Sequence, residues 1–293
     1  MITKQYRNIF TAVAIFATMT PGIASAADTQ PGDFIPAPPG TQGFLLYGFY
    51  SHYDDATFSE STIPATLESY VIMPRYVYFY DIAGMTADIN VLVPIGKLAH
   101  ASVGGVPLHG TEGFGDLTVA GTLWLVNDPK ANRYLALAGY LNFPTGSYVA
   151  GNDLNLGSNR YSGTLQLGSI HGLNDKWFLE FVVDATAYAD NDDVDGKGAT
   201  LSQDPTYTFQ SWVNYQAFEK VRLSLGYAAY WGGEQTVNGL ANGITSEKQQ
   251  VRAAITYSIA PTVQVLAQVN HDFDVTGGLH QNTSGLIRLM NLF

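Results

Sequence analysis

Few residues of this sequence have the types and spacing that acid–base catalysis needs. His271 and Asp272 are adjacent, and a carboxylate can help a histidine to activate water as a general base. Asp190, Asp192 and Asp193 could extend such a site. The sequence contains neither the Gly-x-Ser-x-Gly elbow of serine hydrolases nor the H-E-x-x-H motif of zinc proteases. We therefore expect no enzymatic activity and no cofactor, and we keep a hydrolase at a loop rim as the alternative.

Metal chemistry has little support in the sequence. Four other histidines lack the paired spacing of zinc ligands, and we interpret them as solvated loop or rim residues: His52, His100, His109 and His280. The acidic run 190–196 partly matches a calcium loop, with Asn191, Asp193 and Asp195 at ligand positions. Ser202 stands where a glutamate would complete the coordination sphere. We predict no metal site and a solvated acidic loop, with divalent bridging to lipopolysaccharide phosphate as the alternative.

The amino terminus has the features of a secretory signal peptide. Lys4 and Arg7 precede an apolar run from Ile9 to Met19, and the small residues Ala24-Ser25-Ala26 follow. We predict removal of residues 1–26, which leaves 12 basic against 25 acidic residues and a net charge of −13. Nucleic acid is not an expected partner of so acidic a chain. The absence of cysteine excludes disulfides and cysteine metal sites.

The segment 27–42 differs from the rest of the expected mature chain. Pro31, Pro36, Pro38 and Pro39 make it an extended stretch before the first strand. We interpret it as a tail that is either flexible or inserted into the lumen. Since no linker interrupts residues 43–293, we expect them to form one domain.

From Gly43 onward, apolar and polar residues alternate with the period of a β-strand. Trp177, Leu179 and Phe181 share one face of such a strand, while Glu180 and Asp184 share the other. Twelve strands are expected, at 43–53, 66–80, 84–95, 114–126, 132–143, 160–171, 176–188, 205–217, 220–231, 248–259, 262–274 and 284–293. Short turns alternate with six long polar loops, at 54–65, 96–113, 144–159, 189–204, 232–247 and 275–283.

This pattern predicts a transmembrane antiparallel up-and-down β-barrel of about 12 strands. Hydrocarbon cannot solvate backbone amides, so a membrane-spanning sheet must close and leave no edge. An apolar outside and a polar inside explain the mean hydropathy of only +0.02. Short periplasmic turns and long extracellular loops place both chain ends at the periplasm. A soluble β-sandwich is the alternative.

The inward phase of the strands identifies the side chains that a solute would meet. Both signs of charge are present among the candidate pore-lining residues: Arg75, Asp88, Asn90, Asp116, Gln166, Glu180, Asp184, Gln210, Asn214, Arg222, Arg252, Gln264, Gln268 and Arg288. Such residues could filter solutes by charge, or they could pair with each other as an interlocked core. Loop 96–113, long and nearly uncharged, is the candidate constriction.

Motifs along the chain point to a particular family. The last strand ends at Phe293, which resembles the carboxy-terminal signal that the barrel-assembly machinery recognises. The chain also resembles the outer-membrane meta-pathway phenol-degradation transporter family at four places: Pro38-Pro39-Gly40, Gly113-Phe114-Gly115-Asp116-Leu117, Phe143-Pro144-Thr145-Gly146-Ser147-Tyr148 and Asn155-Leu156-Gly157-Ser158-Asn159-Arg160-Tyr161.

The resemblance implies passive entry of small, often aromatic or hydrophobic, solutes and transfers no catalytic residue. A non-conducting barrel that acts as an enzyme, receptor or anchor is the second class of function that the sequence allows. The expected partners are a small-molecule solute, outer-membrane lipid with lipopolysaccharide, and the barrel-assembly machinery. The expected location is the cell outer membrane, reached by export through the periplasm.

Overall fold

The computed structural model describes residues 27–58 and 61–293, and the expected leader, residues 1–26, lies outside them. The regular secondary structure of this part of the chain consists of β-strands. Between residues 27 and 293, leaving aside 59 and 60, no helix is long and apolar enough to span a membrane.

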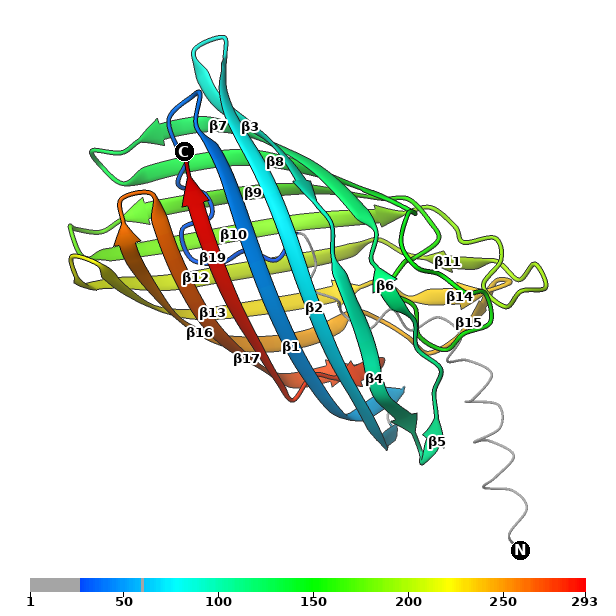
Figure 1. Cartoon of the computed structure of the whole chain (residues 1–293). Coiled ribbons are helices and arrows are strands. Elements are labelled where there is room, and N and C mark those ends of the chain that lie inside the picture. Colours follow the sequence, from blue (N-terminus) through cyan, green and yellow to red (C-terminus); the bar gives the residue numbers. More distant parts are fainter. Residues whose placement is uncertain (1–26, 59–60) are drawn as a thin grey trace, which may run out of the picture.

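Twelve long strands of the described chain close into an antiparallel barrel, which confirms the predicted fold class (Figure 1). In chain order they are β1 (Gln42–Phe58), β2 (Ser61–Ile82), β3 (Met85–Leu92), β7 (Leu117–Asp128), β8 (Arg133–Phe143), β9 (Ser162–Gly172), β10 (Trp177–Tyr188), β12 (Thr206–Phe218), β13 (Val221–Gly232), β16 (Glu247–Ala260), β17 (Val263–Thr276) and β19 (Thr283–Leu292). Each overlaps the range expected from the sequence.

The barrel closes where the first strand meets the last. β1 pairs with β19 from Gly43 to His52 and with β2 on its other side, so the blue and red ends of the chain lie together in Figure 1. Every wall strand therefore has a ladder partner on both sides. Closure satisfies the backbone donors and acceptors that an open sheet would leave at its edges.

The two ends of the barrel differ as the sequence predicts. At the turn end, β2 and β3 are joined by Ala83 and Gly84 alone, whose φ angles of 54° and 83° fit a tight hairpin turn. The C-terminal Phe293 lies at this end, where its backbone N–H donates to the Gln42 carbonyl at 2.8 Å. In bacterial barrels the short turns are periplasmic, so the opposite, loop end corresponds to the outside.

The loop end carries additional strands, most of them only two or three residues long. They are β4 (Ile95–Val103), β5 (Val106–Pro107), β6 (Glu112–Phe114), β11 (Leu201–Gln203), β14 (Gln235–Val237), β15 (Leu240–Ala241) and β18 (Gly278–His280). β11, β14 and β15 form a separate small sheet from two loops. The loops are thus largely ordered by hydrogen bonds of their own.

Loop 96–113, the candidate constriction, is largely built onto the wall through the pairings of β4, β5 and β6. Ile95–Val103 forms β4, which pairs with β2 between Ala65 and Ile72 and extends the wall beyond the end of β3. Pro94 separates β3 from β4 because proline cannot donate to the ladder. The backbone groups of Ile95–Val103 are thus hydrogen-bonded in the wall. The length and composition of the loop, on which the candidate constriction was based, do not show this pairing.

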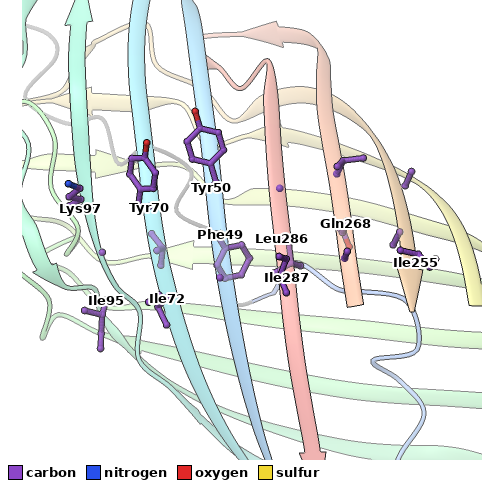
Figure 2. Close-up of a pocket in the computed structure, with 18 of the residues that line it drawn as sticks. Phe49, Tyr50, Tyr70, Ile72, Ile95, Lys97, Ile255, Gln268, Leu286 and Ile287 are labelled. Atoms are coloured by element: carbon purple, nitrogen blue, oxygen red, sulfur yellow. The ribbon is translucent and has the colours of Figure 1, made fainter. Parts of the chain in front are cut away.

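The outer face of the wall is apolar. Phe181, Val183 and Ile255 are among many large apolar side chains exposed there, at outward positions of their strands. Figure 2 shows a shallow depression on this face, lined by Tyr50 and Tyr70 among others. An apolar outer surface of this extent is what a lipid environment requires of a barrel.

Candidate functional site in the barrel interior

The barrel interior contains most of the polar residues that the sequence assigned to it. Thirteen of the fourteen candidate pore-lining side chains point inward and hydrogen-bond or pack there: Arg75, Asp88, Asn90, Gln166, Glu180, Asp184, Gln210, Asn214, Arg222, Arg252, Gln264, Gln268 and Arg288. Their inward direction follows from strand alternation. Gln166, Gln210 and Asn214 are fully buried, so the interior is filled rather than open.

Asp116 departs from the assignment to the lumen. It precedes β7 at the loop end, where one carboxylate oxygen accepts from the backbone N–H of Gly146 at 2.9 Å. The other oxygen accepts from the N–H of Ser158 at 2.8 Å and from its hydroxyl at 2.5 Å. Asp116 therefore anchors the loop 144–159, and we correct its role from pore lining to loop anchoring.

The interior is filled by residues 27–41, which we call the N-terminal segment (blue, inside the barrel in Figure 1). Two wall amides hold its start, since Gln166 and Gln210 donate to the Ala27 carbonyl at 2.7 and 3.2 Å. Gln210 also accepts from the Thr29 backbone N–H at 3.0 Å. Of the two states that the sequence allows for this segment, flexible or lumen-inserted, the structure has the second.

The N-terminal segment lies in the barrel without joining its ladder. None of residues 27–41 belongs to a strand, and residues 27–39 are held by side-chain contacts with the wall. At the exit of the segment, Gly40 and Thr41 exchange backbone hydrogen bonds with Phe79 of β2 and lead into β1. Withdrawal of residues 27–39 would break the side-chain contacts and leave the ladder of the twelve wall strands intact. It therefore resembles a bound ligand tethered to β1 more than a structural element of the wall.

Charged wall residues pair with the N-terminal segment. Arg288 contacts Asp33 at 2.5 Å, and Arg252 lies 3.5 Å from Asp28. Glu180 accepts from the backbone N–H of Gly32 at 2.9 Å. The two arginine side chains are almost completely buried, so each needs its carboxylate to offset the cost of lost hydration.

A second set of polar contacts lies nearer the loop end. Lys248 lies 3.6 Å from the buried Asp272, and Gln250 donates to the other oxygen of Asp272 at 2.6 Å. Arg252 donates in turn to Gln250 at 2.6 Å and to Gln210 at 2.8 Å. The network carries both signs of charge across the interior, so wall–wall pairing and pairing with the N-terminal segment coexist.

A small cavity remains between the N-terminal segment and the wall. It has a volume of about 60 Å³ and is lined by Arg75, Gln268 and Phe49, among others. The buried Oε1 of Gln268 has no hydrogen-bond partner there. This space holds only a few water molecules, whereas binding pockets for small organic molecules are typically ~300–1,000 Å³. This cavity by itself is too small for a solute of aromatic size.

An apolar belt, which the sequence reasoning missed, lines nine of the twelve wall strands on the inside, and β12, β13 and β16 contribute nothing to it. It is one cluster of buried side chains: Phe34, Leu45, Tyr47, Met73, Val77, Phe79, Leu92, Trp124, Tyr134, Ala136, Ile170, Val182, Leu266 and Leu286. The available signal was the loss of alternation, because β1 and β2 contain runs that are apolar on both faces. The interior therefore has apolar and polar sides, and polar residues such as Arg222 and Gln264 reach the turn end as well.

The dyad of His271 and Asp272 does not form. Consecutive side chains of a strand point to opposite faces, and here His271 is exposed outside while Asp272 is buried inside. His271 instead contacts the Asn282 carbonyl through Nδ1 at 2.5 Å. The geometry that a general base would need is absent from this pair.

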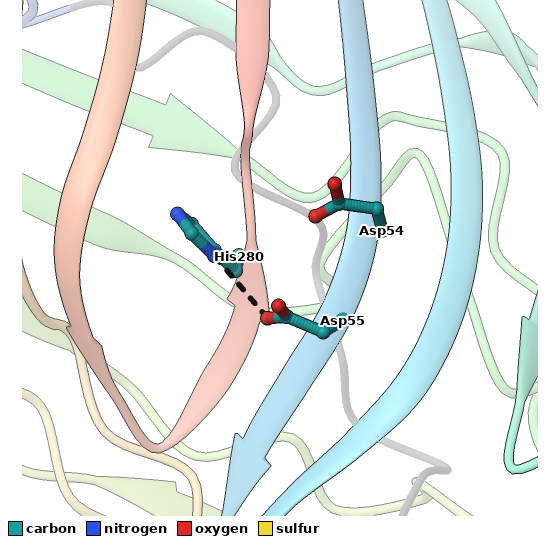
Figure 3. Close-up of side chains that lie close together, drawn as sticks. All are labelled: Asp54, Asp55 and His280. Atoms are coloured by element: carbon teal, nitrogen blue, oxygen red, sulfur yellow. Dashed lines mark ion pairs between the residues drawn. The ribbon is translucent and has the colours of Figure 1, made fainter.

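Three potential metal ligands do meet at the loop end (Figure 3). Asp54, Asp55 and His280 place ligand atoms within 4.8 Å of one another. His280 contacts Asp55 at 3.2 Å and the carbonyl oxygen of Asp272 at 2.8 Å. The histidine, expected to be solvated, is half-buried and ties β18 to the end of β1.

The acidic loop 190–196 is folded by its own side chains. Asp195 accepts from the backbone N–H of Lys197 at 2.8 Å and of Ala199 at 3.0 Å, which lowers the pKa of the Asp195 carboxyl. Asn191 is buried and donates to the Tyr148 hydroxyl at 2.9 Å. Candidate calcium ligands are thus engaged in loop hydrogen bonds, as in Asx turns.

Comparison with known proteins identifies the family. The family model described as "Putative MetA-pathway of phenol degradation" matches residues 52–288. The chain belongs to this family. The resemblance inferred from its turn motifs is thereby confirmed. A search of curated proteins gave no significant match.

Solved structures agree with this membership. The COG4313 outer membrane channel from Pseudomonas putida F1 is 29% identical, with a TM-score of 0.86 over 91% of this chain and 100% of that one. The β domain of the Bordetella autotransporter BrkA is 11% identical, with a TM-score of 0.53 over 86% of this chain and 100% of that one, and shows the fold alone. These relatives are outer-membrane barrels.

Proposed function

We propose that this family member is an outer-membrane channel for the passive uptake of small aromatic or hydrophobic solutes, opened by withdrawal of the N-terminal segment. One observation carries the proposal. In the described part of the chain, residues 27–39 of the occluding segment make no backbone–backbone hydrogen bond to the wall, so they can leave without unfolding it. The family description and the channel from Pseudomonas putida F1 support the same assignment.

The two zones of the interior suit such solutes. The apolar belt would shield an aromatic ring from water. The charged part of the interior, with Arg252 and Glu180, would bind or exclude solutes according to their charge. In this proposal the thirteen inward residues line the pathway once the segment has left.

Export and assembly complete the proposal. A cleaved leader 1–26 would carry the chain to the periplasm, and Phe293 at the end of β19 would be presented to the barrel-assembly machinery. The apolar outer face would then contact outer-membrane lipid and lipopolysaccharide. Mass spectrometry of protein purified from membranes tests the first step, since a mature chain that does not begin at Ala27 would contradict it.

Single-channel recording in planar bilayers tests the function. We expect the full chain to show small or rare openings and a variant without residues 27–41 to show a larger, steady conductance. If the shortened barrel folds, as judged by β-sheet circular dichroism, but carries no current, the interior is not a pathway. A non-conducting receptor or anchor would then be the better assignment.

A further inference from the structure

The side chain of Phe34 occupies a slot in the inner wall. The ring is buried, with 4% exposure, although it belongs to the N-terminal segment rather than to the wall. It packs in the apolar belt, among Trp124, Ala136 and Val182. The wall thus encloses an aromatic ring that it does not itself supply.

The floor of the slot is one row of residues across neighbouring strands, with two small residues at its centre. Trp124 on β7 pairs with Ala136 on β8, which pairs with Gly168 on β9, which pairs with Val182 on β10. A Cβ atom at Gly168 would lie 2.2 Å from the Phe34 ring. Gly168 has no positive φ angle, so space for the ring, and not backbone conformation, requires glycine here.

The slot also presents polar groups beside the ring. The indole N–H of Trp124 donates to the Phe34 carbonyl oxygen at 2.9 Å. The adjacent Asp33 is held at 2.5 Å by Arg288, which belongs to β19 and not to the four strands of the slot. An apolar pocket with a few fixed polar groups is the usual form of a small-molecule site.

We propose that this slot is the solute-binding site of the channel, and that Phe34 is an internal competitor for it. The inference rests on the proposed function. The solute class is a single aromatic ring with an oxygen acceptor, or a carboxylate, at the end of a short aliphatic chain. Its ring takes the place of the Phe34 ring, and its oxygen accepts from Trp124 once the Phe34 carbonyl has left with the N-terminal segment.

The competition fixes the direction of each effect. While Phe34 fills the slot, a solute must displace it, so the apparent affinity is reduced by the fraction of time for which the slot is free. Truncation of the ring weakens the competitor without changing the wall. Substitution of Gly168 by leucine in the same variant then fills the slot again from the wall side.

Hydrocinnamate is a suitable probe, and hexanoate is its non-aromatic counterpart. Binding is measured by isothermal titration calorimetry on the full chain in lipid nanodiscs. We expect Phe34→Ala to bind hydrocinnamate about tenfold more tightly than the natural chain, since loss of a buried Phe contact is worth well over the free energy of a tenfold change. The added Gly168→Leu should abolish the gain. Hexanoate should bind weakly to both the natural chain and the Phe34→Ala variant.

The matched control is Gly139→Leu in the Phe34→Ala background. Gly139 is on the neighbouring strand β8, faces outward, and has open space around its Cβ position. It should leave the affinity unchanged. The slot would be refuted if the Gly168→Leu and Gly139→Leu variants bound hydrocinnamate with equal affinity. It would also be refuted if Phe34→Ala bound hydrocinnamate no more tightly than the natural chain.

Two further results separate this proposal from the function on which it rests. Trp124→Phe keeps an aromatic wall and removes the donor. In the barrel without residues 27–41, where no Phe34 carbonyl occupies this donor, the substitution should weaken hydrocinnamate binding by about tenfold, and it serves if Gly168→Leu does not fold. If the shortened barrel conducts but the variants do not differ in hydrocinnamate affinity as predicted, the channel function is supported and the binding slot is refuted. If the slot binds hydrocinnamate but the shortened barrel carries no current, the binding site is supported and the channel function is refuted.

Discussion

The ion pair of Asp33 and Arg288 should control how often the N-terminal segment leaves the barrel. Asp33 lies on the segment and Arg288 on β19, 2.5 Å apart, with side-chain exposures of 16% and 3%. The pair exists only in the closed state, because withdrawal separates the two residues. Asp33→Asn therefore destabilises the closed state alone.

The size of the effect follows from the burial of the pair. A hydrogen bond to a charged group is worth about 1.5–3 kcal/mol, and removing one partner of a fully buried pair costs about 3–5 kcal/mol. Asp33 is partly exposed, so we take the lower range. At about 1.4 kcal/mol per factor of ten, the ratio of open to closed states should rise about 10- to 150-fold.

Open probability in planar bilayers measures this ratio directly. Asp175→Asn is the matched control, since it makes the same charge change at an exposed turn residue. The exchanged pair, Asp33→Arg with Arg288→Asp, should restore part of the closure that either single variant loses. If Asp33→Asn opens no more often than Asp175→Asn, the pair does not hold the segment and the reasoning is refuted.

Three other outcomes follow from the same contacts. In the barrel without residues 27–41, Glu180→Gln should shift the reversal potential in a salt gradient toward anions and Arg252→Gln toward cations, whereas unchanged potentials would show that neither meets permeating ions. Asp116→Ala removes three hydrogen bonds from loop 144–159, so limited proteolysis should cut that loop faster; the same cutting rate as in the natural chain would contradict its anchoring role. The backbone donors around Asp195 lower the pKa of its carboxyl below the usual value of 3.8, so its stabilisation is full above that value and is lost as the pH falls through the lower one. Hydrogen exchange at residues 195–199 should rise in acid, and the rise should be missing in Asp195→Asn.

The barrel itself was predictable because alternation is a local property. A strand with one face toward lipid shows its period within a few residues, as in the run from Trp177 to Tyr188, and the turns between strands are marked by glycine, proline and asparagine. The position of each residue in this alternation then correctly predicted that thirteen side chains point into the interior. Nothing beyond neighbouring residues was needed for either result.

The features that the sequence reasoning missed depend on contacts between distant residues. Nothing local shows that β4 continues the wall beside β2, or that Asp116 accepts from residues about thirty and forty positions later in the chain. The path of the N-terminal segment is set by wall amides such as Gln166 and Gln210. The alternation of polar and apolar residues along the strands predicted that these amides point inward, but it could not show that they bind a peptide segment.

Cysteine chemistry gives the most direct test of the central claim, that the N-terminal segment closes the barrel and must leave for it to conduct. The natural chain has no cysteine, so Thr29→Cys and Gln210→Cys can be joined by a short, reducible thiol cross-linker across a contact of 3.0 Å. The account predicts that the cross-linked channel stays closed and that reductant restores its openings within one recording. Equal conductance before and after reduction would contradict it.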